Sequence, residues 1–293
     1  MNIGAFELNE PSPELRQPHA ISCLRPWIDV GSVGTLAISR LEEHLGAQEL
    51  GRLTRPGNFF DFTRYRPMVY NVEDRRVFSV PNSVINYARQ DKGPDLLFFH
   101  LLEPHAHAEE YTESVMDVIK HLGVKRHLRV GSMYDAVPHT RPLLVTGSSS
   151  NVSKPTRMGK LMLRPSTYQG PTTILNLVSQ EVDKLGIENT TVLIHLPQYV
   201  QLEEDYAGAA CLLEILREMY DLPESLADPS RGHQQYKEVD AEMASNPAAK
   251  AFVERMEMYY DSQKAERDLE QQPPLSPEVE RFLRELDKGP GSR

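Results

Sequence analysis

The most informative stretch of the chain reads Leu96-Leu97-Phe98-Phe99-His100-Leu101-Leu102 and passes directly into Glu103-Pro104-His105-Ala106-His107. It is apolar on both faces apart from His100, as expected of a central parallel strand. Two other segments repeat this pattern of strand, polar turn and helix: Trp27–Val30 before Gly31–Gly34, and Thr191–Leu196 before Pro197–Tyr199. These repeated units predict an α/β fold with a mostly parallel sheet. The strand ends then converge on one edge, where such folds place a ligand or partner site.

Composition and charge limit the class of protein. The chain has 293 residues, 40% of them hydrophobic, and a net charge of −10. The size and composition fit a globular protein, and the acidic balance disfavours nucleic acid. No apolar run approaches the ~20 residues of a membrane span, so no membrane partner is expected. Met1–Pro18 lacks the features of a signal peptide, and Cys23 and Cys211 form no disulfide framework, so we expect a cytoplasmic protein.

The pattern of elements divides the chain into three parts. Residues 1–24 are polar and rich in proline, which predicts an extended arm. Residues 25–222 alternate strands and helices and predict one α/β domain. Residues 223–293 predict a helical extension after a polar stretch, with helices over about 248–269 and from Ser276 onward.

Within the domain, alternation and turn residues place the other elements. Helices are expected at about 34–45, 108–122, 171–185 and 205–220, and strands at 127–130, 143–146 and 161–163. A hairpin is expected from Met68–Val72 and Val77–Val80. The arginines 64, 66, 75 and 76 near it form either a basic patch or, as we favour, a solvated turn.

Apolar side chains beyond a single core favour self-association. The last helix carries a stripe of Val279, Phe282, Leu283 and Leu286, and the aromatic run Phe59, Phe60 and Phe62 looks exposed. The extension cannot bury its apolar faces alone, so it packs on the domain or on another subunit. We therefore expect a homo-oligomer.

The turn Gly31-Ser32-Val33-Gly34 is the first candidate ligand site. Its N–H groups at a helix start could hold an anion. It matches neither GxGxxG nor a Walker A loop. Tight packing of helix on strand accounts for Gly31 and Gly34 equally well, and we favour that interpretation.

Polar residues after two other strands form further candidates. Glu103, His105 and His107 have acid–base character, but the sequence supplies no standard set of three metal ligands, so no metal is expected. The loop from Asp135 to Pro142 contains His139 and Arg141, and its prolines indicate a fixed shape. Arg141 is positioned either to bind an anion or to anchor the loop to Asp135.

The end of the last strand completes the list of candidates. Gln198 and Tyr199 are placed to contact a ligand or partner. His195 within the apolar strand is more typical of a hydrogen-bonded core residue. No Gly-x-Ser-x-Gly elbow is present and neither cysteine adjoins a histidine, so no catalytic residues are assigned and the sequence favours a protein that is not an enzyme. The candidate ligand-binding set is Gly31, Ser32, Gly34, Glu103, His105, His139, Arg141, Gln198 and Tyr199.

Several of these motifs occur in an order that resembles a bacterial member of the proteasome assembly chaperone 2 family. In the first half they are Arg25–Gly34, Glu103-Pro104-His105 and Val137–Pro142. In the second half they are Tyr168–Thr172, His195–Val200, and Asp205-Tyr206 opening a helix that contains Leu212-Leu213. The resemblance covers roughly Arg25 to Leu222.

The resemblance implies a three-layer α/β/α sandwich similar to the nucleoside phosphorylase fold, here with a helical C-terminal extension. Relatives bind proteasome α-subunits and help to assemble them, many through a tail ending in a hydrophobic residue, Tyr and any residue. This sequence closes on Gly289-Pro290-Gly291-Ser292-Arg293 and lacks that pattern. Some bacterial members carry the label ATP-grasp-like carboligase, which no glycine-rich phosphate loop or spaced carboxylate set supports here, so no cofactor is expected.

Two hypotheses follow. The first is a non-enzymatic, chaperone-like assembly protein of unknown partner that forms a homo-oligomer, with a trimer preferred. The alternative is a binding protein or enzyme for a small anionic or nucleoside-like ligand at the carboxyl edge of the sheet. The missing catalytic constellation favours the first hypothesis.

Overall fold

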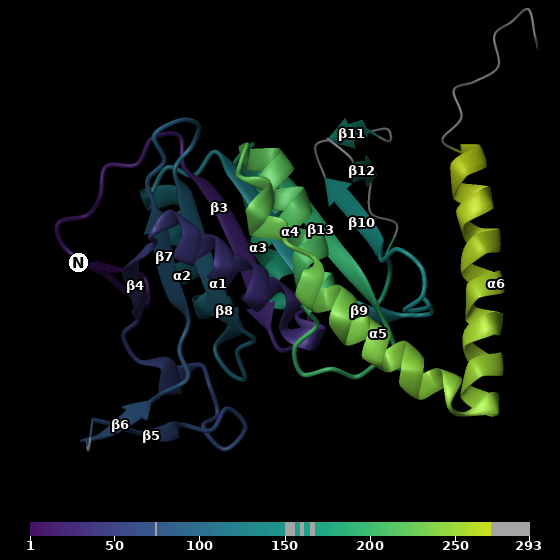
Figure 1. The fold of residues 1–293 in the computed structure, drawn as a ribbon. Coiled ribbons are helices and arrows are strands. Elements are labelled where there is room, and N and C mark those ends of the chain that lie inside the picture. The colour runs from purple at the N-terminus through teal and green to yellow at the C-terminus, as the bar shows by residue number, and fades with distance from the viewer. Residues whose placement is uncertain (74, 150–155, 159–160, 165–167, 271–293) are drawn as a thin grey trace, which may run out of the picture.

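The computed structural model describes the backbone of residues 1–73, 75–149, 156–158, 161–164 and 168–270 (Figure 1). Side chains are described within residues 1–73, 75–149 and 168–263. No helix in these ranges combines the length and apolarity that a bilayer span requires.

Four parallel strands form the centre of one large sheet. They lie in the order β8 (Leu96–Leu102), β3 (His19–Arg25), β9 (Arg126–Asp135) and β13 (Glu188–Pro197). The register pairs Ile21 with Phe98 in the hydrophobic cluster on one face and Ala20 with Leu97 in the cluster on the other, so apolar side chains face both sides of the sheet. The expectation of a buried parallel strand at Leu96–Leu102 is confirmed.

Other strands extend the sheet on both sides of this centre, most of them antiparallel, so the sheet is mixed rather than mostly parallel as expected. Antiparallel hairpins and returns need no crossover helix, and the apolar patterns of single strands do not reveal their direction. Beyond β8 lie β7 (Val84–Ala88), β4 (Gln48–Leu53), β2 (Phe6–Leu8) and β1 (Asn2–Ile3). Beyond β13 lie β10 (Leu144–Ser149), β12 (Leu161–Arg164) and β11 (Thr156–Met158).

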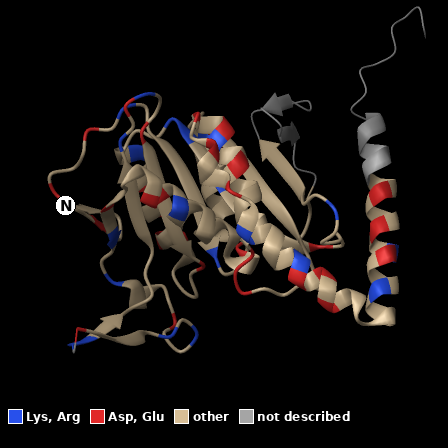
Figure 2. Ribbon diagram, viewed as in Figure 1, with Lys and Arg blue, Asp and Glu red and all other residues tan. Residues whose placement is uncertain are grey.

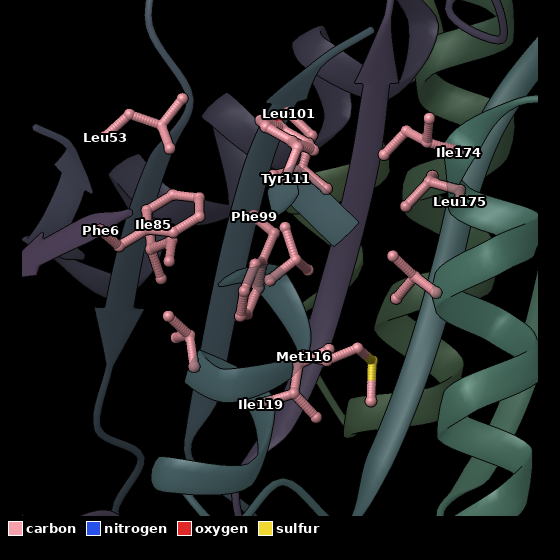
Figure 3. Close-up of a cluster of buried hydrophobic side chains, with 14 of the residues drawn as sticks. Phe6, Leu53, Ile85, Phe99, Leu101, Tyr111, Met116, Ile119, Ile174 and Leu175 are labelled. Atoms are coloured by element: carbon pink, nitrogen blue, oxygen red, sulfur yellow. The ribbon is translucent and has the colours of Figure 1, made fainter. Parts of the chain in front are cut away.

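Helices cover both faces of the sheet. On one face α1 (Val33–Leu45) and α4 (Tyr206–Tyr220) pack against one hydrophobic cluster. On the other face α2 (Ala108–His121) and α3 (Ile174–Lys184) pack against a second cluster, in which Tyr111 and Phe99 lie between helix and sheet (Figure 3). The result is an α/β fold with a central mixed sheet flanked by helices.

The N-terminal segment differs from the expected extended arm. It supplies β1, β2 and most of the central strand β3, and it buries Phe6 and Leu8. The strand expected at Trp27–Val30 is instead a loop that ends in the short 3₁₀ helix η1 (Val30–Ser32). The expected extended arm was wrong because the prolines before His19 indicated a loop, whereas the residues that follow form a strand. In that strand the side chains of Ala20, Ile21 and Leu24 are fully buried.

After α4 the chain forms η3 (Glu224–Ala227), α5 (Ser230–Ala244) and α6 (Pro247–Glu270). α6 confirms the expected helix at 248–269, whereas α5 lies in the stretch expected to be merely polar. Only Gly232 of α5 is buried, so this helix carries little hydrophobic pattern. The stripe Val279–Leu286 lies outside the described residues.

The predicted hairpin is confirmed as β5 (Met68–Val72) and β6 (Arg75–Ser79), which pair only with each other and stand clear of the main sheet (Figure 1). The segment before it contains η2 (Pro56–Asn58). Phe59 and Phe60 are only 1% and 2% exposed, so the expectation of an exposed aromatic run was wrong. Their rings pack edge to face on Tyr111 beneath the sheet.

Candidate functional site

All nine candidate residues follow the carboxyl ends of the four parallel strands. The turn Gly31–Gly34 comes after β3, Glu103 and His105 after β8, His139 and Arg141 after β9, and Gln198 and Tyr199 after β13. Parallel strands end on one edge, so the sequence placed these residues on the same edge of the sheet. Within the described residues, however, the hydrogen bonds of these candidates form distinct groups around Asp29, Glu103, His139 and Arg141.

The first group is at the start of α1. The Asp29 carboxylate accepts the Gly34 N–H at 2.7 Å and the Thr35 hydroxyl at 2.5 Å. Helix N-termini attract negative charge, and here the chain supplies it from its own Asp29. A Cβ on Gly34 would lie 2.5 Å from Cys23 Sγ on β3, which accounts for this glycine by close packing.

Gly31 and Ser32 join this group to the start of α4. Gly31 has φ +59°, and its carbonyl oxygen accepts the Asp205 N–H at 2.7 Å. The Ser32 hydroxyl donates to the Glu203 carbonyl oxygen at 3.0 Å. The left-handed conformation of Gly31 suits glycine. The turn therefore connects two helices on the same face of the sheet.

The second group surrounds Glu103 on the opposite face. Its carboxylate accepts the Ile174 N–H at 3.1 Å at the start of α3. Burial raises the pKa of Glu103, and the hydrogen bond from Ile174 partly opposes the shift. The His105 ring accepts the Asp61 N–H at 3.1 Å, and its centroid lies 4.5 Å from that of the Tyr65 ring, with the two planes tilted by 55°.

The third group joins His139 to Tyr199. The Tyr199 hydroxyl accepts the His139 backbone N–H at 3.0 Å and lies 2.7 Å from His139 Nδ1. On the other side of the ring, His139 Nε2 lies 3.6 Å from Asp240 Oδ1 of α5. Burial lowers the pKa of His139, and Asp240 opposes the shift. The side chain of Gln198 is exposed.

Arg141 anchors α6 to the β9–β10 loop. Its guanidinium binds both carboxylate oxygens of Asp261, at 3.1 and 3.0 Å, and one oxygen of Glu257 at 3.0 Å. The Tyr260 hydroxyl donates to the Pro142 carbonyl oxygen at 2.8 Å beside them. Of the two roles expected for Arg141, loop anchoring is therefore observed, with α6 as its partner rather than Asp135.

We predict that Arg141→Ala loosens α6 while the sheet stays folded. Loss of a guanidinium that holds two carboxylates removes a bidentate pair and leaves Glu257 and Asp261 facing each other. Hydrogen exchange should accelerate across residues 247–263 and stay unchanged in β8 and β9. Arg255→Ala, at an exposed arginine of α6, is the matched control. Equal exchange in α6 of both variants would contradict the anchoring role.

Asp135 is bound to His195 instead. Asp135 Oδ2 lies 2.7 Å from His195 Nδ1, and the Thr146 hydroxyl lies 2.8 Å from His195 Nε2. A carboxylate, an imidazole and a hydroxyl in this order resemble an acid–base relay. Thr146, however, lies within the paired part of β10, so we assign the chain of contacts to joining β9, β13 and β10. The expectation of a hydrogen-bonded core histidine is confirmed.

Sequence reasoning missed the residues that connect the first and third groups. Asp205 caps α4 and accepts the Gly208 N–H at 2.7 Å. It also accepts the hydroxyl of Tyr236, on α5, at 2.8 Å, and the Tyr236 ring lies 6.2 Å from the His139 ring. Burial raises the pKa of Asp205, and these hydrogen bonds oppose the shift. A tyrosine in a polar stretch gives no sequence signal for this role.

Trp27 is a large apolar side chain at this edge that is 62% exposed. Two hydrogen bonds from β9 hold the loop that carries Trp27. Ser132 of β9 donates its N–H to the Ile28 carbonyl oxygen at 2.8 Å and its hydroxyl to the Val30 carbonyl oxygen at 2.6 Å. A large aromatic side chain is thus presented to solvent on a fixed backbone, beside polar groups that bind one another.

Within residues 1–73, 75–149 and 168–263 no three His, Cys, Asp or Glu side chains come together to hold a metal ion. The hydrogen-bonded groups of the edge therefore offer neither a metal centre nor an assigned nucleophile. They hold the strand ends, the loops and helices α3 to α6 in place.

The family model named PAC2 family matches residues 23–245. This is well over half of the chain and includes all nine candidate residues. The chain belongs to the PAC2 family. A search of curated protein sequences gives no match.

Solved structures share the fold. The Mycobacterium tuberculosis protein of unknown function Rv2714 is 23% identical over 92% of this chain and 93% of its own, with a TM-score of 0.77. The proteasome-assembly chaperone homologue Rv2125 of the same organism is 22% identical over 80% and 99%, with a TM-score of 0.68. PbaB of Pyrococcus furiosus, an archaeal proteasome activator, is 15% identical over 82% and 97%, with a TM-score of 0.56. At these identities the likeness establishes the fold.

Proposed function

We propose that this protein is a non-enzymatic, chaperone-like assembly protein that works through protein–protein contacts as a homo-oligomer in the cytoplasm. Membership of the PAC2 family supports the proposal, as do structural neighbours described as a proteasome-assembly chaperone homologue and a proteasome activator. The proposal includes a trimeric state, a sandwich of the nucleoside phosphorylase type, and a helical extension that begins at residue 223.

The observation that carries the proposal is the contrast between Trp27 and its polar neighbours. Asp29 binds the Gly34 N–H, Arg141 binds α6, and His139 binds Tyr199, so these groups are engaged within the chain. Trp27 remains exposed on a loop fixed by Ser132. Tryptophan is enriched among the residues that dominate binding energy in protein interfaces. A rigid anchor of this kind favours a protein partner over a small polar ligand.

Affinity capture from native lysate tests the proposal. Wild-type protein, Trp27→Ala and the control Tyr259→Ala serve as baits, since Tyr259 is an exposed aromatic residue on α6. We expect one defined set of proteins to be retained by wild type and control and to be reduced at least tenfold with Trp27→Ala, as loss of a hot spot of about 2 kcal/mol implies. Identical sets on all three baits would contradict the proposal.

The single tryptophan also provides a direct readout. Addition of a captured protein to the purified chain should shift the emission of Trp27 to shorter wavelength as its ring leaves water. An unchanged spectrum at saturating partner would place the contact elsewhere on the molecule.

A further inference from the structure

The β5–β6 hairpin cannot be explained as part of the core. Every side chain described in its two strands is exposed, among them Tyr70, Val72 and Phe78, the last by 67%. A two-stranded hairpin is at best marginally stable in water, and monomers rarely expose contiguous apolar surface of this kind. The hairpin therefore needs a protein surface to cover it.

One face of the hairpin combines an aromatic ring with positive charge. The register pairs Val69 with Phe78 and Asn71 with Arg76, which puts these four side chains on the same face. The Arg76 guanidinium lies 5.9 Å from the Phe78 ring. Residues 64–80 contain four arginines against two acidic residues, in a chain whose net charge is −10. This face is thus apolar and basic on an acidic protein.

A complementary surface exists on the other side of the molecule. A cleft of about 790 Å³ lies between the β9–β10 loop, α4 and α5. Its apolar lining includes Ala210, Cys211, Leu143 and Ala227. Glu214 and Glu224 line it as well, as do Arg217, which pairs with Glu214, and Arg141, which pairs with Glu257 and Asp261 of α6. Residues 203–228 carry eight acidic residues and one basic residue, and the red segments of the ribbon in Figure 2 mark Asp and Glu positions along α4, α5 and α6.

The hairpin cannot reach the cleft of its own chain. It is inserted between β4 and β7, on one side of the four parallel strands, whereas the cleft adjoins β10 on the other side. In Figure 1 the hairpin and α5 project from different ends of the molecule. A second copy of this chain supplies the acidic segment 203–228 to face the arginines of the hairpin and an apolar cleft to receive Phe78.

We propose that the Phe78 face of the hairpin docks in the α4–α5 cleft of a second copy of this chain. Phe78 enters the apolar lining, and Arg76 meets Glu224 at the rim. The contact is head to tail, because each copy offers its hairpin to one neighbour and its cleft to another. Such a contact closes into a ring or continues as a filament. This inference deepens the homo-oligomer of the proposed function and rests on that part of it.

Mixing two defective variants tests the contact directly. The hairpin variant is Phe78→Ser with Arg76→Glu, and the cleft variant is Glu224→Arg with His233→Arg. All four side chains are exposed, so each variant should fold, which circular dichroism checks. Light scattering should give the monomer mass of 33.3 kDa for each variant alone and twice that mass for the mixture, which retains one intact contact.

The matched control changes the opposite face of the same hairpin, Tyr70→Ser with Arg75→Glu, and should assemble like wild type. Four results would overturn the proposal: a monomeric wild type, wild-type mass for either defective variant, a mixture that stays monomeric, or dissociation of the control. The experiment uses purified protein alone, so its failure leaves the Trp27 capture result untouched. If the hairpin variant still assembles, the hairpin binds a protein other than a second copy of this chain.

Discussion

Gly131→Ala should destabilise the protein by about 3 kcal/mol, the upper range for overpacking a core. Gly131 lies in the central strand β9, and a Cβ there would be 2.1 Å from the Ile28 carbonyl oxygen. That oxygen accepts the Ser132 N–H, so the new methyl group must push the Trp27 loop off the strand and break the hydrogen bond. Chemical denaturation in urea measures the loss.

Gly93→Ala separates this effect from the general cost of adding a methyl group. Gly93 has φ +81° and nothing within 4 Å of a Cβ, so only backbone strain of about 1 kcal/mol is expected. Equal losses for the two variants would show that the Ile28 contact has no special weight. If Gly131→Ala remains folded, it should also capture less partner, because the loop that presents Trp27 is displaced.

Acidification should remove roughly 2 kcal/mol of stability through His127 between pH 6.5 and 4.5. His127 is fully buried against the Ser22 hydroxyl at 2.8 Å, and burial together with Arg129 lowers its pKa from 6.5 to about 3. The folded state therefore holds His127 neutral while the unfolded chain takes up a proton. Its contribution is complete above pH 6.5 and is lost as the pH falls toward 3.

Urea denaturation at several pH values measures this slope. His127→Gln should flatten the dependence between pH 6.5 and 4.5 even if it is less stable at pH 7. His121→Gln, at an exposed histidine at the end of α2, should keep the wild-type slope. A wild-type slope in His127→Gln would contradict the role of His127. His19, whose pKa burial lowers to about 4, adds to the acid sensitivity in the same direction.

The sequence predicted elements whose pattern is local. The apolar run Leu96–Leu102 and the amphipathic helices α1, α2 and α4 form from their own residues, and they appear where expected. β3 was missed because prolines precede it. α5 was missed because its contacts are tertiary: Gly232 packs on Ala207, and Tyr236 binds Asp205. Strand direction was misjudged for β10, since side-chain alternation is the same in both directions.

In the candidate site, too, the local features could be predicted from the sequence and the tertiary contacts could not. The edge that carries the nine residues follows from where strands end, so it could be read from the sequence. The charged partners of these residues could not be predicted from the sequence. Asp240 faces His139, and Glu257 and Asp261 bind Arg141, from helices about a hundred residues further along the chain. Exposure of Trp27 and burial of Phe59 depend on packing, which composition does not reveal.

The most direct test of the assembly role is the size of the protein in extract of the cells that produce it, compared with the purified chain. Size-exclusion chromatography with immunodetection measures both at equal concentration. If this protein binds its partner through Trp27, it should elute from extract in a larger complex than the purified oligomer. The Trp27→Ala variant in extract should elute at the size of the purified oligomer. Identical elution of wild-type protein in extract and in purified form would contradict the account.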